Sequence, residues 1–457
     1  MANNTNLSTQ FASDFGKYIN KKVLPLSVRQ LVAYQFGTKR KLDKGNGVTY
    51  QATRFVRVPL PQYPISEGIA PPGETMSIQI VTGVAQQWGD RINLTDVSEL
   101  TTFHPVWKQA ERLLALQVAE TLERNTFNAL MAGSQVNYVG AVAGRGALTS
   151  SNVLSPHEID RAVGVLTTVG APRFMGDKDE DTKVQMDGEG PARASKPPLQ
   201  NPHYVAIMHP LPTQDMRENS VISNAWSYSD INRLYNMEVG EWGGVRFTVS
   251  NMVPPFIGVA AVSPTAGTAG NLATGTYYVI VTGTDTQKGY ESYICQVSAG
   301  VSVTGPTGSI SVPLPTNPGY TYNVYIGTTT SPTNLGLCAS GPTYGPAAGQ
   351  AVGLVNSTTA VITGVGMSQT PPAAPATGVT VYPTFIFGRD AYSQVELDKI
   401  DTFYLREADK FDPLNQLRML SWKIFYGTLI ENQEFMLRIE GASAFVSTPD
   451  AGGVDNY

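Results

Sequence analysis

The side chains that most often perform catalysis are few in this sequence and stand apart from one another. The four histidines, His104, His157, His203 and His209, occur singly, and none forms the HExxH pattern of a zinc site. The sequence contains no GxSxG turn, no GxxxxGK[ST] loop and no GxGxxG between a strand and a helix. We therefore predict no catalytic residues, no cofactor and no metal ion, and a protein that is not an enzyme.

One acidic cluster looks like part of a calcium loop. It comprises Asp177, Asp179, Glu180 and Asp181. The glycine at the sixth position and the glutamate at the twelfth, which the EF-hand loop requires, are both missing. The pattern favours a solvated loop.

The chain has only two cysteines, Cys295 and Cys338, without CxxC spacing and without a nearby histidine. Two cysteines are too few for a disulfide framework. We predict two ordinary thiols. A single Cys295–Cys338 bridge is the alternative if their domain faces an oxidising exterior.

The length and charge of the chain limit the class of protein to which it can belong. At 457 residues the chain exceeds the roughly 250–300 residues at which one core stops growing, so two or three folding units are expected. Its 32 basic and 37 acidic side chains give a net charge of -5, without the basic surplus of a protein that grips nucleic acid by its phosphates. The sequence shows neither a signal-peptide pattern nor a run of roughly 18 apolar residues. These features predict a soluble protein, made in the cytoplasm, that contacts mainly other proteins.

Residues 1–47 form a basic arm in which eight lysines and arginines face only Asp14 and Asp43. Such an arm can contact nucleic acid through its phosphates, without sequence preference, or lie along an acidic neighbouring subunit. A solvated amphipathic arm is the alternative. The candidate contact residues are Lys21, Lys22, Lys39, Arg40 and Lys41.

Two alternating runs between residues 48 and 88 flank a turn at Pro71, Pro72 and Gly73. This pattern predicts a long β-hairpin whose arms, about 13 residues each, would reach about 40 Å. An isolated strand pair of that length is unstable unless it lies on something else, so a partner surface is implied. The charges predicted to meet this partner, with solvated loop charges as the alternative, are Arg54, Arg57, Glu67 and Glu74.

A long helix is predicted over residues 104–132, because Pro105 suits a first turn and Gly133 a helix end. At the usual rise it would extend about 43 Å and span a domain as a spine. Its predicted buried face comprises Trp107, Ala110, Leu114, Val118 and Leu122.

A second helix is predicted after residue 155. Ser155, Pro156 and Glu158 have the pattern of a capping box with proline at the first helical position, and Gly170 marks the end. The polar stretch 175–202 is expected to be an exposed loop. The apolar run YVAIM that follows it predicts a buried strand.

The sharpest change in composition begins at Pro254-Pro255. From there to Gly378 short strand-like runs alternate with turn residues, which predicts an inserted all-β sandwich of immunoglobulin type over 255–378. A proline-rich exit mirrors the entry, so we expect two semi-rigid stems. Only three side chains in the insert are charged: Asp285, Lys288 and Glu291.

After residue 379 the charged residues return and the host fold resumes. The last segment alternates between apolar and polar side chains around a break at Glu431, Asn432 and Gln433. Two long antiparallel strands would give this pattern.

This ordered combination of basic arm, long hairpin, spine helix and mixed domain ending in long strands resembles the major capsid proteins of tailed phages with the HK97-type fold. Nearly all of the chain outside the insert takes part in the likeness. Four segments are similar to those of capsid proteins of the phage N4 type: GVAQQWGDRINLTDVSELTTFHPVW, YVAIMHPLPTQDMREN, FIFGRDAYSQVEL and DPLNQLRMLSWKIFYGTLIENQEFMLRIE.

The resemblance implies an α+β, HK97-like fold, with the insert decorating an axial domain. The implied parts are an N-terminal arm (1–47), an extended loop (48–92), a peripheral domain with the spine helix (93–202 and 399–457), an axial domain (203–254 and 379–398) and the insert (255–378).

The resemblance also implies a function. The chain would assemble into hexamers and pentamers of an icosahedral phage head that encloses double-stranded DNA, in a virion assembled in the bacterial cytoplasm. Implied partners are a portal protein, a separate scaffolding protein and, as a candidate, a decoration protein. DNA would be contacted only non-specifically, and no membrane is involved. Excising 256–378 is expected to leave assembly intact.

Two features depart from some members of the wider fold. Between Lys44 and Lys108 the sequence has no lysine, so the lysine–asparagine isopeptide link that welds some shells is not expected. The large cleaved N-terminal scaffolding region of some relatives is also not seen, hence the separate scaffolding protein.

Two other interpretations compete. A tail or surface adhesin component could carry an immunoglobulin-like domain, but it predicts repeats, and the sequence shows one sandwich and no repeat. A hydrolase with an accessory binding domain would need a catalytic constellation that the sequence lacks.

Overall fold

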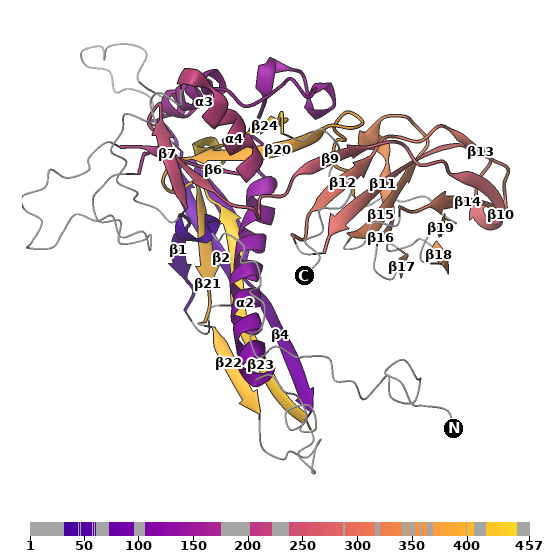
Figure 1. Ribbon diagram of the computed structural model, residues 1–457, viewed down its shortest axis with the longest axis horizontal. Coiled ribbons are helices and arrows are strands. Elements are labelled where there is room, and N and C mark those ends of the chain that lie inside the picture. Colours follow the sequence, from indigo (N-terminus) through magenta and orange to yellow (C-terminus); the bar gives the residue numbers. More distant parts are fainter. Residues whose placement is uncertain are drawn as a thin grey trace, which may run out of the picture.

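The computed structural model describes residues 32–43, 45, 47–56, 58, 60, 73–95, 106–174, 202–221, 237–286, 288–315, 320–340, 345–346, 352–356, 359–362, 369–398, 400–405 and 417–445. A long narrow part carries α2, β4, β22 and β23, a body above it carries α3 and α4, and a β-rich part extends to one side (Figure 1). The three α-helices of the described residues are α2 (Val106–Met131), α3 (Pro156–Val169) and α4 (Pro210–Glu218).

A five-stranded sheet forms the narrow part, with the 14-residue β23 at its centre. One edge of β23 pairs with β4, and the other pairs with β22 and then β21, beyond which β1 adds in parallel. Its strands are β1 (Thr38–Lys41), β4 (Gln86–Thr95), β21 (Tyr392–Glu396), β22 (Asp401–Leu405) and β23 (Leu417–Ile430).

The helix α2 lies along this sheet as the predicted spine. Four of the five side chains of its predicted buried face are buried, and Trp107 packs beside them half-buried: Ala110, Leu114, Val118 and Leu122. They meet the β23 side chains Leu420, Trp422, Ile424 and Tyr426. The helical period read from the sequence is therefore confirmed.

A second sheet forms the body and is covered by α3. All five residues of the predicted strand YVAIM are buried in β6, which confirms that prediction. On α3, Ile159, Ala162 and Leu166 pack against this sheet. Its strands are β5 (Val136–Tyr138), β6 (Tyr204–Met208), β7 (Glu238–Trp242), β8 (Val245–Val249), β20 (Thr380–Phe387) and β24 (Met436–Gly441).

The capping box predicted for α3 does not form, although the helix does. The side chain of Ser155 makes no capping hydrogen bond. The Glu158 carboxylate turns elsewhere: it accepts from the Gly140 N–H at 3.1 Å and from Arg161 at 3.3 Å. Gly170 ends the helix in the left-handed conformation, at φ 75°, as predicted.

The C-terminal strands do not form the antiparallel pair that their alternation suggested. β23 and β24 are separated by a short 3-10 turn (η5, Gln433–Phe435) and belong to different sheets, since β24 pairs with β20 and β5. The bend is fixed because the backbone N–H groups of Glu431 and Asn432 both donate to the Ala391 carbonyl. Alternation predicts a strand but does not choose its partner.

The insert is a two-layered all-β sandwich, as predicted at that coarse level. Its layers share one apolar core, to which Leu272, Ile310 and Ile362 contribute from one layer and Val279, Val324 and Cys338 from the other. The first layer comprises β9 (Phe256–Val259), β11 (Gly275–Asp285), β12 (Glu291–Cys295), β15 (Tyr320–Gly327), β16 (Gly336–Ser340) and β17 (Gly345–Pro346), with β13 (Val301–Val303) beside β11. The second comprises β10 (Thr265–Leu272), β14 (Gly308–Pro313), β18 (Val352–Asn356) and β19 (Thr359–Ile362).

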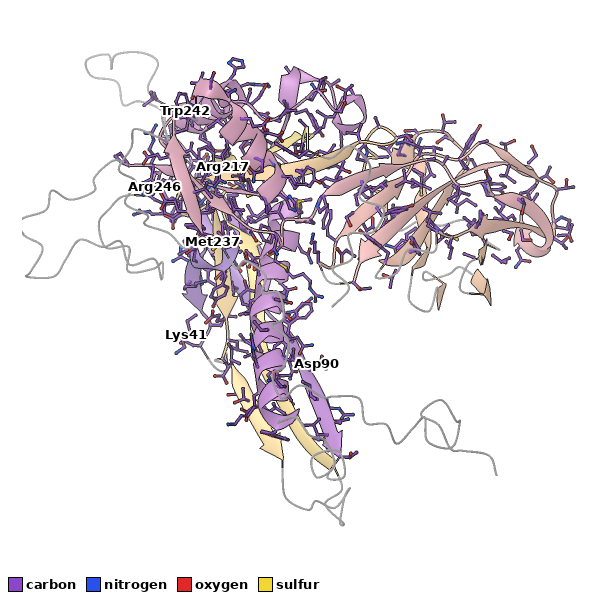
Figure 2. The ribbon with its side chains drawn as sticks, viewed as in Figure 1. Lys41, Asp90, Arg217, Met237, Trp242 and Arg246 are labelled. Carbon is purple, nitrogen blue, oxygen red and sulfur yellow. The ribbon has the colours of Figure 1, made fainter. Side chains whose placement is uncertain are left out.

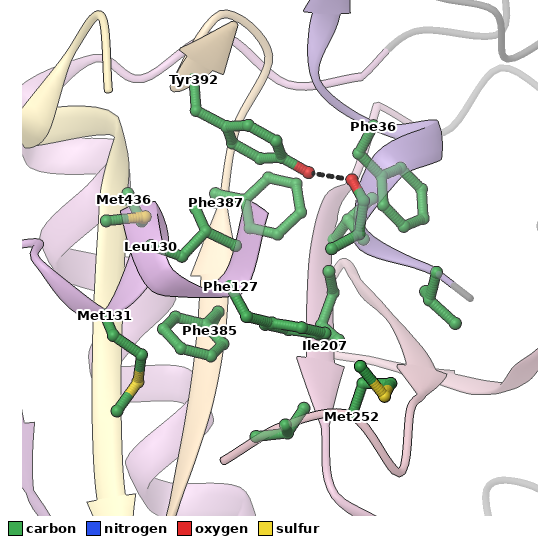
Figure 3. Packing of buried hydrophobic residues seen from close by; sticks show 14 of the residues in the cluster. Phe36, Phe127, Leu130, Met131, Ile207, Met252, Phe385, Phe387, Tyr392 and Met436 are labelled. Carbon is green, nitrogen blue, oxygen red and sulfur yellow. Dashed lines mark hydrogen bonds between the residues drawn. The ribbon is translucent and has the colours of Figure 1, made fainter. Parts of the chain in front are cut away.

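The largest buried cluster joins the predicted arm, the spine helix, the body and the insert (Figure 3). Phe36 comes from the predicted arm, Phe127 and Leu130 from α2, and Phe385 and Phe387 from β20. The Tyr392 hydroxyl donates to the Ala33 carbonyl at 2.6 Å, the dashed line of Figure 3. Val32, Ala33 and Phe36 of the predicted arm are thus part of the core, whereas Lys41 and Asp43 are exposed.

Candidate assembly surfaces

Two strands of the chain form a small sheet of their own. β2 (Thr49–Phe55) pairs antiparallel with β3 (Ile78–Val84), from Thr49 opposite Val84 to Phe55 opposite Ile78. The predicted hairpin is therefore confirmed in the pairing of its strands but not in their length, since each has seven residues and not about 13. Residues 61–72, with the turn prolines, lie outside the described residues. After the buried Ala85 the chain continues from β3 into β4.

One face of this hairpin is open to solvent and carries four large apolar side chains beside Thr49, Gln51, Thr53 and Thr82. Residues directly opposite each other in an antiparallel pair share a face, so Phe55 and Ile78 lie together and Ile80 and Val84 follow along β3. Their exposed fractions are 62%, 55%, 54% and 55%. Of the 16 large apolar side chains that are exposed among the described residues, nine lie between residues 48 and 84. Such a concentration marks an interaction surface.

The opposite face of the hairpin is tied to the body. The Arg54 guanidinium donates to Asn432 at 2.6 Å and to Gln79 at 2.5 Å. Tyr50 packs on a small buried cluster of Leu42, Ala85 and Val395. The hairpin thus leaves the face with the four apolar side chains free, because Arg54 and Tyr50 on its other face contact the body.

The four predicted hairpin charges are not brought together. Arg54 lies on the inner face and is bonded within the chain, whereas Glu74 is exposed. Arg57 and Glu67 lie outside the described residues. Their contacts with a second subunit stay a prediction.

The basic residues of the arm are likewise placed separately. Lys39 donates to the Tyr34 carbonyl at 2.6 Å and lies over the Tyr34 ring, and Arg40 pairs with Glu431 at 3.2 Å. Lys41 is exposed and points outward from β1 (Figure 2). Lys21 and Lys22 lie outside the described part of the chain. Contact of these residues with DNA or a neighbour stays a prediction.

Glu123 holds the arm on the spine helix. Its carboxylate, fully buried, accepts from the backbone N–H groups of Val32 and Ala33 at 2.7 Å each and of Tyr34 at 3.0 Å. Burial raises the pKa of Glu123, against the three N–H donors and Lys39, which lower it. No sequence pattern predicts this contact, because the partners lie about 90 residues apart and are backbone groups.

Replacing Glu123 by alanine is expected to release the arm. Three buried N–H groups would lose their acceptor, and each such group costs about 1–3 kcal/mol. We expect the free energy of unfolding, measured by urea denaturation, to fall by about 3 kcal/mol. The matched variant Glu111→Ala removes an exposed glutamate of the same helix and should change it by no more than about 0.5 kcal/mol. Equal effects of the two changes would contradict the anchoring role.

A buried ion cluster lies where the body meets the insert. Arg145 makes two hydrogen bonds of 2.7 Å to Glu440, which is fully buried, and a third of 2.7 Å to the Ala373 carbonyl. Arg438 pairs with the same carboxylate at 3.0 Å. In the sequence, Arg145 lies between two glycines and matches no pattern that would predict this contact. The alternation in β24, which puts Arg438 and Glu440 on one face, was the available signal.

His209 and the two cysteines, whose residue types often take part in catalysis, occupy structural positions. His209 caps α4, its Nδ1 accepting from the Leu211 N–H at 3.3 Å, and burial lowers its pKa to about 3. Cys295 and Cys338 are free and buried, and burial raises the pKa of each thiol to about 12. His104 and the acidic cluster at 177–181 lie outside the described residues.

Within the part of the chain that the structure describes, no group of three or more His, Cys, Asp or Glu side chains is placed to hold a metal ion. None of the described helices is long and apolar enough to cross a membrane.

Comparisons with known proteins give structural neighbours only. No protein-family model matches the sequence, and the search of curated proteins finds no match. Three solved structures resemble the chain with a TM-score of 0.49 each. The capsid of Ralstonia phage GP4 is 10% identical over 94% of this chain and 95% of that one. The capsid of cyanophage P-SCSP1u is 11% identical over 96% of both, and that of cyanophage Pam1 is 11% identical over 97% and 100%. Similarity at this level does not by itself assign a function.

Proposed function

We propose that this chain is the major capsid protein of a tailed phage, a structural protein that assembles into the hexamers and pentamers of an icosahedral head around double-stranded DNA. The observation that carries the proposal is the outward face of the β2–β3 hairpin, on which the apolar side chains Phe55, Ile78, Ile80 and Val84 are more than half exposed. A subunit that works alone has no use for such a face. A subunit of a shell buries it against its neighbour.

The energetics favour many copies of one moderate contact over a single strong one. Burying apolar surface stabilises by about 25 cal/mol per Å², and obligate interfaces bury roughly 2,000–5,000 Å². Tyr50 and Arg54, near the two ends of β2, hold the hairpin against the body, so it enters the interface already ordered. Preorganisation of this kind lowers the entropic cost of association.

The finer assignment rests on the order of parts. We infer an HK97-like subunit of the phage N4 type, with the α2 segment and β23 in a peripheral domain and β6 and β20 in an axial domain. The division is less clean than the implied bounds, since α3 and β24 join the β6 sheet and β21 joins the β23 sheet. For the insert, the two-layered sandwich supports an immunoglobulin-like fold.

The partners proposed for such a subunit are its own copies, a portal, a separate scaffolding protein and a decoration protein on the insert. DNA would be met without sequence preference, through exposed basic groups such as Lys41. Assembly would take place in the bacterial cytoplasm, and the product would be the virion. The proposal does not include catalysis.

Electron microscopy of the purified full-length protein, expressed with and without a scaffolding protein, tests the proposed function. Closed shells or ring-shaped capsomers of five and six subunits are expected. Fibres or trimers would instead favour a tail or adhesin component. Particles of single-subunit size at all concentrations, with scaffolding protein present, would refute the proposal.

Mature particles are expected to contain no covalently linked subunits. The stretch between Lys44 and Lys108, which includes the whole hairpin, has no lysine to form an isopeptide bond. Boiled particles should therefore run on denaturing gels as a single band near 49.1 kDa. A ladder of dimers and higher species that persists under reducing conditions would contradict this.

A further inference from the structure

We infer that the insert is not a removable appendage: it completes the core of the host and forms one cooperative folding unit with it. The inference does not depend on the proposed function. It differs from what the proline-rich ends of the insert suggest, namely a separate domain on two stems. The junction between insert and host carries the argument.

The backbone joins the two parts in one sheet. The entry strand β9 pairs antiparallel with β20 of the body, Ile257 opposite Thr380 and Phe256 opposite Val381. The two stems also bond to each other, because Gly258 N–H donates to the Val379 carbonyl at 2.9 Å and Gly378 N–H to the Gly258 carbonyl at 3.0 Å. The large layer of the insert therefore continues the sheet of the body as a single 13-stranded assembly.

The side chains of the junction belong to the host core. Phe256 of β9 and Ile294 of β12 are fully buried in the cluster formed by Phe127, Phe385 and Ile207. Tyr290, at the turn before β12, packs on that cluster and meets the Phe256 ring edge-on, with ring centroids 5.6 Å apart. Such aromatic contacts add to the apolar burial.

Polar contacts fix the same junction. The Arg145 guanidinium, bonded to Glu440 and to the exit-stem carbonyl of Ala373, lies 3.4 Å from the centroid of the Phe256 ring. The Arg145 side chain of the body thus contacts β24, the entry strand β9 and the exit stem. Farther along, Gly289 lies so close to α2 that a Cβ there would be 2.9 Å from Cδ of Arg124.

Excision of 256–378 would therefore do more than remove a decoration. It would take Phe256, Tyr290 and Ile294 out of the core and deprive Arg145 of one of its acceptors. The expectation that shells form without the insert does not take these contacts into account. We now expect the excised chain to misfold or aggregate.

The chain carries a separate natural probe for each part. All five tryptophans lie outside the insert, at Trp88, Trp107, Trp226, Trp242 and Trp422. Both cysteines lie inside it, and both thiols are buried in the described sandwich. Tryptophan fluorescence therefore reports unfolding of the host, and pulse labelling of thiols under denaturant reports unfolding of the insert, in the full-length protein.

If insert and host are one unit, the two probes give the same midpoint in urea and in temperature. The variant Ile310→Ala opens a cavity in the sandwich far from the junction and should lower both midpoints equally, by roughly 2–6 °C. Reciprocally, Leu114→Ala under the spine helix should advance thiol exposure by a similar shift.

The inference is overturned if thiols become exposed in a transition separate from every fluorescence transition. It is also overturned if Ile310→Ala moves only the thiol midpoint while Leu114→Ala moves only the fluorescence midpoint. The wild-type comparison decides the question even where a variant fails to fold.

Discussion

Replacing Ile78 and Ile80 together by aspartate is expected to abolish assembly while the subunit stays folded. Both side chains point outward from β3 and are more than half exposed, so charging them should change the free energy of unfolding by no more than about 0.5 kcal/mol each. At an interface the same carboxylates would be buried without partners. An unpaired buried charge costs at least several kcal/mol, which exceeds what a shell contact can absorb.

The measurement is sedimentation and electron microscopy of the variant under conditions in which the wild-type protein assembles. Urea denaturation of the same preparation checks the fold. Val221→Asp is the matched control, since Val221 is also about half exposed, at 51%, but lies outside the hairpin. Normal shells from the double variant would remove the hairpin from the interface and with it the main support for the proposed function.

Local periodicity made part of this structure predictable. The spine helix was recognisable because Ala110, Leu114, Val118 and Leu122 recur with a helical period, and the sheet beneath α2 meets that face. The hairpin strands were recognisable from alternation. In both cases the signal lies within one segment, and no distant partner has to be known.

What could not be predicted depends on partners far apart in the chain. The capping-box pattern identified α3, but Glu158 bonds to Gly140 instead of completing the box. Alternation identified β23 and β24 without showing that the turn between them sends each to a different sheet. Neither propensity nor spacing encodes such a choice, because it is made by packing.

Only part of the candidate assembly surface, likewise, could be predicted from the sequence. A hairpin that needs a partner surface was predicted from alternation, although its strands have seven residues each and not about 13. The exposed apolar side chains of β3, Ile78, Ile80 and Val84, were not among the predicted contact residues. The contact residues that were predicted because they are charged do not all face outward: Arg54 and Arg40 are bonded within the chain. The sequence does not identify the ion-pair partner of a charged residue. A pair within the chain therefore cannot be distinguished from a pair between subunits.

Replacing Arg145 by methionine is expected to destabilise the protein about as strongly as Glu123→Ala. Methionine fills a similar volume, but Glu440 would keep only Arg438 as its cationic partner, and the Ala373 carbonyl would lose its donor. Breaking a buried ion pair costs about 3–5 kcal/mol, and the remaining arginine places the expected loss near the lower end, about 3 kcal/mol. Urea denaturation followed by tryptophan fluorescence measures it.

A double-mutant cycle with Glu440→Gln separates the pair from its surroundings. Two residues in one buried network should show a coupling free energy of about 1–3 kcal/mol. The control is Arg389→Met, which breaks the solvent-accessible pair with Asp390 and should cost no more than about 1 kcal/mol.

Because Arg145 contacts both stems of the insert, its loss should advance thiol labelling of Cys295 and Cys338 together with the fluorescence change. A loss confined to one probe would mean that the cluster stabilises only one side of the junction, and a coupling near zero would mean that Arg145 acts through packing on Phe256 and not through its charge.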